Sequence, residues 1–408
     1  MDTVYDGMFI PILTYAASAW CEKVQNCTQK RHLRQAQRTA LLKLTRCYRT
    51  TSTEGLMVLA GKAPIELVIE ERAKRYWLKV KDVTKLARMD LNIEKYERMV
   101  PVKDMPHPAT LFRVREMRHL KITTEIYTDG SKSEVGTGAA FVVYERNNEI
   151  YNEKFRLEKY CSNYQAELLA ISRAIEWCVA NDRTENVCIN TDSMSALQAL
   201  LSQKSSDHQV YSIKKLLKDH NLLDRIEFKW VRAHVGIYGN ERADYLAKEA
   251  VEGSQVVFDI IPVCWGKRIL KMNTIQKWQE LWTESTKGRR IYDLLPNIEE
   301  RLMHLNWFPP GRETMIYLSG HDGLGVFKRR FNLSEQTDCM CGEANEDTHH
   351  LIFECVNWQY NRKRLELIAL EEGLTWPCGF YQLIRNEHCF KALTEFFRKI
   401  YKSKNARM

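Results

Sequence analysis

The hydrophobic positions of this 408-residue chain repeat with two different periods. A period of three to four residues, typical of helices, prevails toward both ends, whereas short apolar runs of strand length lie between them. Prolines at positions 101, 106 and 108 mark a linker. The pattern predicts an N-terminal helical region (1–100), a linker (101–121), a central region of strands and helices (122–252) and a helical C-terminal region (262–408).

The central region has the pattern of an α/β fold. A three-strand meander is followed by alternating helices and strands, an order that predicts one mixed five-stranded sheet flanked by helices. We expect strands at Thr124–Thr128, Ala139–Tyr144, Ile150–Leu157, Val187–Thr191 and Ile226–Val231, and helices at Tyr164–Ala180, Ser193–Leu201, Ile213–Leu217 and Asn240–Ala250.

The N-terminal region contains a basic amphipathic segment, Lys30–Leu44, and a second helix expected at about Glu66–Ala87. Arg31, Arg34 and Arg38 lie along the first segment. Such a face can follow nucleic-acid phosphates or serve as an ordinary solvated surface, and both interpretations stay open.

Composition adds few constraints. The net charge of +9 is compatible with a polyanionic partner but also with simple solubility. Most of the 12 cysteines are scattered among apolar or helical positions, as expected for reduced thiols inside a cell. No apolar run reaches the roughly 18 to 20 residues of a membrane span, and the N-terminus lacks the basic start of a signal peptide.

Four acidic residues of the central region point to a metal site. Asp129 and Asp192 follow predicted strands, and Glu167 and Asp244 are expected in the first turns of two helices. If the two strands are parallel neighbours, their carboxyl ends meet at one edge of the sheet. Clustered carboxylates repel one another, and divalent cations remove that repulsion. We therefore expect these four residues to bind two metal ions that cut phosphodiesters.

His234 lies on a glycine-containing loop after the last predicted strand. Its imidazole can approach and leave the expected metal site, which suits proton transfer at a leaving group.

A second cluster lies at residues 339–355, with the pattern Cys-x-Cys-x8-His-x4-Cys. Cys339, Cys341, His350 and Cys355 would provide a closed tetrahedral site for a structural Zn²⁺. His349 is an alternative to His350, because the sequence does not show which histidine turns inward.

The central motifs resemble those of type 1 ribonuclease H: Tyr-Thr-Asp-Gly-Ser, Gln-Ala-Glu-Leu, Asn-Thr-Asp-Ser and Trp-Val-x-x-His-x-Gly-x-x-Gly-Asn-Glu-x-Ala-Asp. The 38-residue separation of Asp129 and Glu167 also agrees with that family. The resemblance implies a ribonuclease H-like fold and cleavage of the RNA strand of RNA–DNA hybrids. It further implies two Mg²⁺ ions, or Mn²⁺, on the four acids, with His234 as general acid/base.

Weaker expectations concern the substrate. Four polar residues near the expected ligands are candidates for contacts with the hybrid: Ser131, Asn163, Gln165 and Asn240. Two other functions remain in competition with the enzyme: a catalytically silent nucleic-acid-binding remnant, and a DNA-cutting enzyme on the same fold.

The flanking regions resemble the polyproteins of insect-type non-LTR (LINE-like) retrotransposons. Tyr15–Trp20 and Leu59–Pro64 are similar to the reverse transcriptase thumb, and residues 319–355 to the zinc-knuckle-like C-terminal region. The chain contains no Tyr/Phe-x-Asp-Asp motif, so the resemblance does not extend to the polymerase palm. It implies an intracellular, nuclear location, binding of other nucleic acid through the basic N-terminal helix, and no membrane partner.

Overall fold

The computed structural model describes residues 2–80, 95–97, 99–101, 104, 122–184, 186–202, 205–223, 225–253, 255–308 and 310–405. The chain forms two compact units, Met1–Val80 with Ile269–Met408, and Lys81–Arg268. The N-terminal and C-terminal helical regions are far apart along the chain but belong to one unit. Most of the expected linker, and the expected end of the second helix at Ala87, lie outside the described residues.

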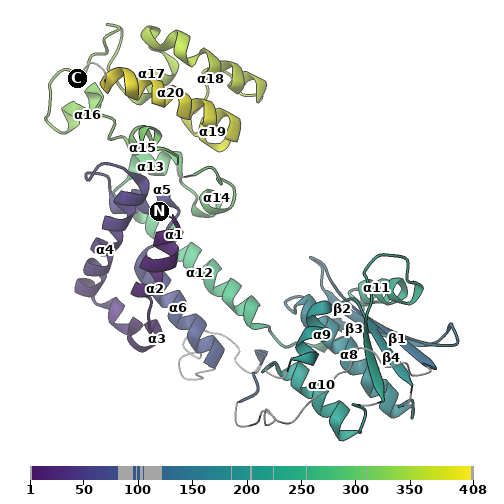
Figure 1. Ribbon diagram of the computed structural model, residues 1–408. Coiled ribbons are helices and arrows are strands. Elements are labelled where there is room, and N and C mark those ends of the chain that lie inside the picture. The colour runs from purple at the N-terminus through teal and green to yellow at the C-terminus, as the bar shows by residue number, and fades with distance from the viewer. Residues whose placement is uncertain are drawn as a thin grey trace. The chain divides into compact units, whose positions relative to one another are not determined.

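The second unit is built on a six-stranded sheet in the order β5-β4-β1-β2-β3-β6 (Figure 1). Its strands are β1 (Thr124–Lys132), β2 (Thr137–Glu145), β3 (Asn148–Leu157), β4 (Val187–Thr191), β5 (Ile226–Trp230) and β6 (Val256–Phe258). The prediction of a mixed sheet is confirmed, but the prediction of five strands is wrong. The additional β6 pairs in parallel with the end of β3 and is only three residues long, too short for a clear alternating pattern.

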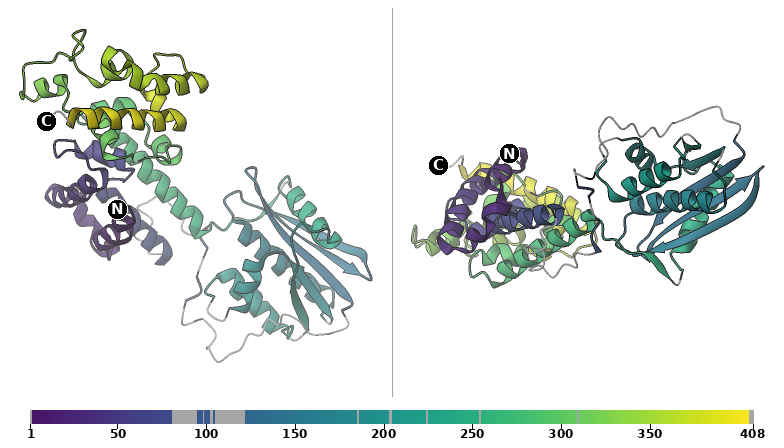
Figure 2. Two further views of the ribbon diagram at one scale, coloured as in Figure 1. Left: turned by 45° about the horizontal axis from the view of Figure 1, so that its top comes forward. Right: turned by 90° about the horizontal axis from the view of Figure 1, so that it is seen from below.

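Helices cover both faces of this sheet. They are α8 (Asn163–Ala180), α9 (Met194–Leu201), α10 (His208–Asp219) and α11 (Tyr238–Ala250). A further helix, α12 (Val263–Glu284), begins in this unit and continues into the other. Figure 2 shows α11 on one side of the strands and the other three helices on the opposite side. Phe141 of β2 belongs to the core under α8, whereas its neighbour Val142 packs with α11. Strand β2 is therefore buried on both faces, as alternating side-chain directions require.

Glycine allows α11 to lie close to the sheet. A Cβ added at Gly138 of β2 would lie 2.1 Å from the carbonyl oxygen of Ala247. A Cβ at Gly239, near the start of α11, would lie 2.3 Å from the ring of Tyr127 on β1. These close approaches set the distance between the sheet and α11, the helix that carries Asp244.

The first unit is helical. Its first part contains α1 (Asp2–Val4), η1 (Tyr5–Phe9), α2 (Ile10–Leu13), α3 (Ala17–Trp20), η2 (Cys21–Gln25), α4 (Cys27–Thr45), α5 (Thr53–Ala60) and α6 (Ile65–Val80). After α12 follow α13 (Arg289–Leu294), α14 (Ile298–Met303), α15 (Arg312–Ser319), α16 (Gly325–Arg330), α17 (Thr348–Phe353), η5 (Val356–Trp358), α18 (Gln359–Glu371), α19 (Phe380–Arg385) and α20 (Glu387–Asn405).

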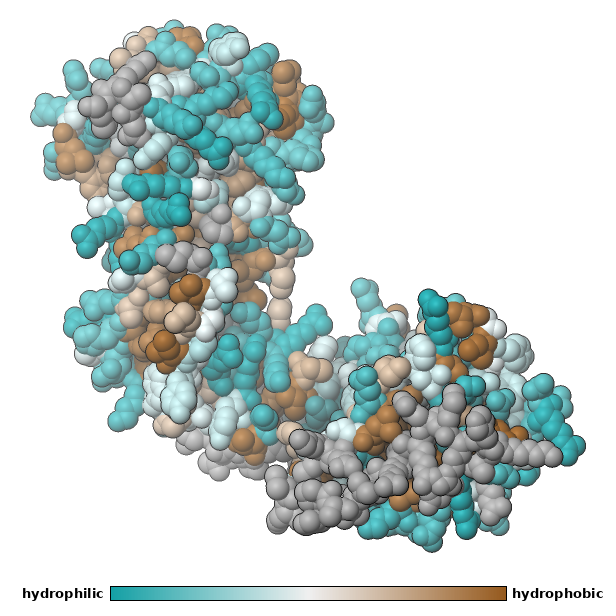
Figure 3. Space-filling model, viewed as in Figure 1, coloured by the Kyte–Doolittle hydropathy of each residue, from teal (hydrophilic) through white to brown (hydrophobic). Residues whose placement is uncertain are grey.

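A buried arginine joins the two parts of this unit. Arg301 of α14 is 5% exposed and donates hydrogen bonds to the carbonyl oxygens of Val58 and Leu59, at 3.1 and 2.9 Å, near the end of α5. Because the end of a helix leaves carbonyl groups without intrahelical partners, the guanidinium supplies donors that α5 lacks. The surface in Figure 3 includes a hydrophobic patch over the first helices. Met8 and Ile12 are among the exposed apolar residues of these helices.

Candidate active site

Asp129 and Asp192 leave two parallel strands at the same point. Strands β1 and β4 are parallel neighbours, and their last paired residues are Thr128 and Thr191. Each aspartate is the next residue in its chain, so both carboxylates reach the same edge of the parallel pair. The expected neighbourhood of the two strands is thus confirmed, although β1 itself continues to Lys132 through its pairing with β2.

Glu167 comes to this edge from helix α8. The helix begins at Asn163, so Glu167 lies in its second turn and the expectation of the first turn was one turn too early. Gly130 makes the approach of the helix feasible, because a Cβ at this position would lie 2.6 Å from the backbone nitrogen of Glu167. A residue with a side chain here would push helix and strand apart.

The three carboxylates form a compact group, in which Asp129 and Glu167 are buried and Asp192 is partly exposed. Asp129, Glu167 and Asp192 each offer an oxygen, and these oxygens lie within 4.8 Å of one another. Burial, reinforced by the charges of Asp192 and Asp244, raises the pKa of Asp129 to about 7. Burial and then the charges of Asp129 and Asp192 raise the pKa of Glu167 well above its usual range. Like charges are therefore held together at a cost to the folded state.

The donor set suits a divalent cation. Asp129 Oδ2 and Glu167 Oε2 are buried, and neither has a hydrogen-bond partner. Unpaired buried carboxylate oxygens are costly, whereas hard cations such as Mg²⁺ prefer such ligands. The arrangement fits the metal site expected from the sequence.

Asp244 stands apart from this group. It is the seventh residue of α11, which begins at Tyr238, so it too lies in a second turn rather than the expected first. Its Oδ2 accepts a hydrogen bond from Lys248 Nζ at 2.6 Å. Asn240, one turn earlier on the same helix, donates to Asp192 Oδ2 at 3.2 Å, which places this part of α11 beside the acids. The charge of Asp244 also contributes to the raised pKa of Asp129.

His234 lies on an exposed turn between β5 and α11. Its φ of +52° and the φ of +82° at Gly236 show that this turn uses left-handed backbone conformations. For a residue with a side chain that conformation is strained, as is frequent at functional loops. The placement agrees with the expected loop, and the catalytic role stays a prediction.

The four polar residues expected to contact substrate occupy different environments. Asn240 is 2% exposed and its Nδ2 donates to Asp192 Oδ2 at 3.2 Å. Gln165 is 1% exposed and closes a capping box with Ser162 at the start of α8. Both side chains are engaged within the protein, and substrate contact by either residue stays a prediction.

Asn163 is exposed and Ser131 is partly exposed, each close in sequence to one of the acids. The Nδ2 of Asn163 lies 3.5 Å from Glu167 Oε1, and Ser131 pairs with Gly138 across the β1–β2 ladder. Substrate contact by these two residues stays a prediction.

Two neighbours of the site were missed by the sequence reasoning. Lys248 is one, and its spacing of four residues from Asp244 on a helix was a usable signal. Trp230 at the end of β5 is the other, since its Nε1 donates to the backbone oxygen of Asp192 at 3.0 Å. Nothing in the sequence indicates that second contact, because it joins separate strands.

The Cys/His cluster is assembled in the first unit. The Sγ atoms of Cys339 and Cys355 are 3.7 Å apart, and Cys341 Sγ is 3.2 Å from His350 Nε2. One ligand atom from each of the four residues lies within 4.8 Å of the others. His350 is 3% exposed, whereas the side chain of His349 is 65% exposed. The structure thus selects His350 from the two alternatives.

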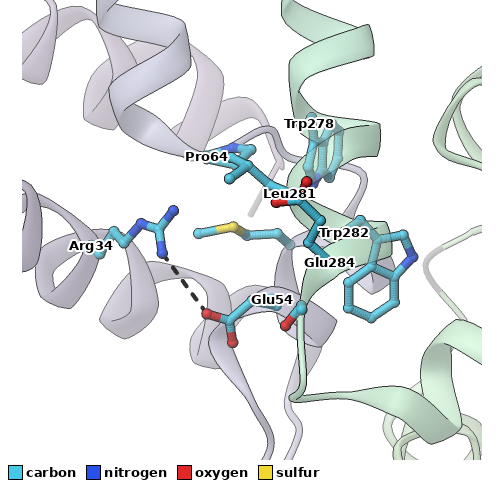
Figure 4. Close-up of a pocket in the computed structure, with 9 residues that line it drawn as sticks. Arg34, Glu54, Pro64, Trp278, Leu281, Trp282 and Glu284 are labelled. Atoms are coloured by element: carbon cyan, nitrogen blue, oxygen red, sulfur yellow. Dashed lines mark ion pairs between the residues drawn. The ribbon is translucent and has the colours of Figure 1, made fainter.

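The basic residues of α4 are largely engaged within the protein. Arg34 Nε donates to Glu66 Oε1 at 2.9 Å, and its guanidinium also pairs with Glu54 at 3.9 Å (Figure 4). Arg38 binds the hydroxyl of Thr53 and the backbone oxygen of Arg49. Of the three arginines considered from the sequence, Arg31 alone is exposed, whereas Arg34 and Arg38 are partly buried.

A pocket of about 210 Å³ lies beside Arg34. Figure 4 shows Pro64, Trp278, Leu281 and Trp282 along its wall, with Arg34 and Glu54 on the opposite side. Trp278 and Trp282 are 3% and 2% exposed, so they belong to the core of the unit.

In the described part of the chain, no helix is long and apolar enough to cross a membrane.

Comparison with known proteins identifies the region that carries the acids. The RNase H family model matches residues 121–252. A protein named Ribonuclease H from Nitrosospira multiformis is 32% identical over 141 residues, which is 31% of this chain and 88% of that protein.

Two further relatives are named as retrotransposon polyproteins. The Retrovirus-related Pol polyprotein from type-1 retrotransposable element R1 of Popillia japonica is 28% identical over 215 residues, 49% of this chain and 79% of that protein. The R1 2 polyprotein of Nasonia vitripennis is 25% identical over 171 residues, 42% of this chain. The chain spans only 39% of the length of this Nasonia relative.

Proposed function

The chain belongs to the ribonuclease H family through residues 121–252, and from this premise we propose that it hydrolyses the RNA strand of RNA–DNA hybrids. The observation that carries the proposal is the convergence of Asp129, Glu167 and Asp192, whose oxygens lie within 4.8 Å of one another. Two buried oxygens without partners add an independent reason for a cation at this place.

Asp129, Glu167, Asp192 and Asp244 would hold two Mg²⁺ ions, for which Mn²⁺ can substitute. Such ions supply water activation and charge stabilisation at the scissile phosphate. The protein contributes the positions of the ligands. Asn240 orients Asp192 through its hydrogen bond of 3.2 Å, and Gly130 lets Glu167 approach the strand.

His234 would handle the proton at the leaving 3′ oxygen. Its exposed turn follows β5, whose last residue Trp230 donates to the backbone oxygen of Asp192, and histidine is a frequent general acid or base. Recognition of RNA would depend on the 2′-hydroxyl groups, the feature by which a protein distinguishes RNA from DNA.

A direct assay compares labelled RNA–DNA hybrid, double-stranded DNA and double-stranded RNA in Mg²⁺. We expect cleavage of the RNA strand of the hybrid alone, and loss of that cleavage in Asp129→Asn. Hybrid binding without cleavage would instead support a silent nucleic-acid-binding module. Cleavage of DNA would favour the alternative of a DNA-cutting enzyme on the same fold.

The similarity to R1 polyproteins supports an origin in a non-LTR retrotransposon. We propose that the chain corresponds to the C-terminal part of such a polyprotein, without the polymerase palm, and that it acts in the nucleus. Imaging of a tagged chain would test the location, and a primer-extension assay would test for polymerase activity. The exposed Arg31 remains the best candidate for phosphate contact on α4.

Cys339, Cys341, His350 and Cys355 would bind a structural Zn²⁺. The four ligand atoms are already gathered, and Glu354 Oε2, 3.2 Å from His350 Nδ1, leaves Nε2 facing Cys341. A carboxylate behind a histidine is a common support for a metal ligand. Metal analysis and the absorption spectrum of the Co²⁺-substituted protein would test the proposal, with loss of the thiolate–Co²⁺ bands expected in Cys355→Ser.

A further inference from the structure

The ion pair between Lys248 and Asp244 lies on α11, the helix whose Asn240 donates to Asp192 Oδ2 at 3.2 Å. Lys248 Nζ is 2.6 Å from Asp244 Oδ2, and the two residues are four apart on α11. Asp244 lies outside the group of acids whose oxygens are within 4.8 Å of one another. Of the four acids expected to bind metal, Asp244 is thus the one whose carboxylate is already paired with a cationic side chain.

The ammonium group acts on the cluster as well as on its direct partner. The charge of Lys248 lowers the pKa of Asp129, against the larger opposing effect of burial. Because four neighbouring carboxylates repel one another, a cation at this position reduces the repulsion in the metal-free protein. A divalent ion bound to Asp244 would also reduce this repulsion, and it would compete with Lys248 for Asp244 Oδ2.

The ion pair between Lys248 and Asp244 can separate at little energetic cost. The side chain of Lys248 is 60% exposed and that of Asp244 is 18% exposed. A lysine on a flexible stem loses little when its ammonium moves into water, and exposed ion pairs are individually weak. The cation is therefore strong enough to hold Asp244 and weak enough to be displaced.

We propose that Lys248 is an internal counter-cation that competes with a divalent metal ion for Asp244 and so sets the affinity of the more weakly bound ion. The inference rests on the proposed two-metal function of this site. Lys248 is a positioning residue in this scheme, because it acts through Asp244 rather than on the substrate.

The experiment is a Mn²⁺ titration of the full chain without nucleic acid, with free Mn²⁺ measured by electron paramagnetic resonance. Lys248→Met should tighten the weaker dissociation constant by about two- to fivefold, the range expected for an exposed ion pair. The same substitution in an Asp244→Asn background should leave that constant unchanged. Lys154→Met is a matched control, because Lys154 pairs with Glu249 at 3.0 Å elsewhere on the surface.

The outcomes separate the inference from the proposed function. Mn²⁺ binding that is lost in Asp129→Asn supports the metal site itself. If that binding exists but Lys248→Met leaves the weaker constant unchanged, or alters it equally in the Asp244→Asn background, the competition is refuted while the metal site stands. Mn²⁺ binding that does not depend on Asp129 would overturn both.

Discussion

Asp129→Asn should stabilise the metal-free protein at alkaline pH, although it removes a residue expected to be essential. The folded-state pKa of Asp129 is about 7, compared with an ordinary value of 3.8. The folded state therefore binds the proton more tightly than the unfolded state. The stability gained from this tighter proton binding is complete below the pKa of Asp129 in the unfolded state. It is lost as the pH rises through the folded-state pKa of about 7.

The magnitude follows from the two pKa values. Their difference, multiplied by about 1.36 kcal/mol for each tenfold change, gives a penalty of ~4 kcal/mol at pH 8 as an upper figure. Asparagine has nearly the same shape and no charge, so it avoids this penalty. The gain should be much smaller at pH 5, where Asp129 is mostly protonated in the folded state.

Hydrogen exchange measured on peptides from β1 and β4 reports on this unit alone. In EDTA at pH 8, exchange in Asp129→Asn should be slower than in the wild type by up to about 1000-fold, and the difference should shrink at pH 5. Mg²⁺ should slow exchange in the wild type more than in the variant, because a ligand stabilises the state that binds it.

Asp219→Asn, at an exposed position at the end of α10, provides the control and should have little effect at either pH. Faster exchange in Asp129→Asn at pH 8, or a difference that does not change with pH, would show that the buried charge is not the source of the cost.

Three further changes test the site. His234→Ala should lower kcat on hybrid by about 100-fold or more with little change in KM, as steady-state kinetics will show, because the imidazole acts on a proton in the transition state. Gly130→Ala should destabilise the unit by about 1–3 kcal/mol in the same exchange assay, since a Cβ there would lie 2.6 Å from the nitrogen of Glu167. Asn240→Ala should weaken Mn²⁺ binding measurably, because Asp192 loses its 3.2 Å hydrogen bond; unchanged binding would leave Asn240 a purely structural residue.

Several features of the site were readable from local sequence. Short apolar runs of strand length located strands β1 to β5, and short polar motifs placed Asp129 and Asp192 where the pairing of β1 with β4 ends, although β1 itself continues to Lys132. Parallel pairing then had to bring these two residues together, as the register Thr128–Thr191 confirms. Such inferences succeed because strand periodicity and helix starts depend on neighbours in the chain.

The remaining features depended on contacts between segments distant in sequence. Burial of Gln165 and Asn240, the choice of His350 over His349, and the engagement of Arg34 by Glu66 follow from how elements pack. The sequence alone determined which residues carry the chemistry and the order of the elements that hold them. Only the tertiary structure decided that three acids converge while Asp244 keeps Lys248, because side-chain distances of a few ångströms are set by the packing of α8 and α11 on the sheet.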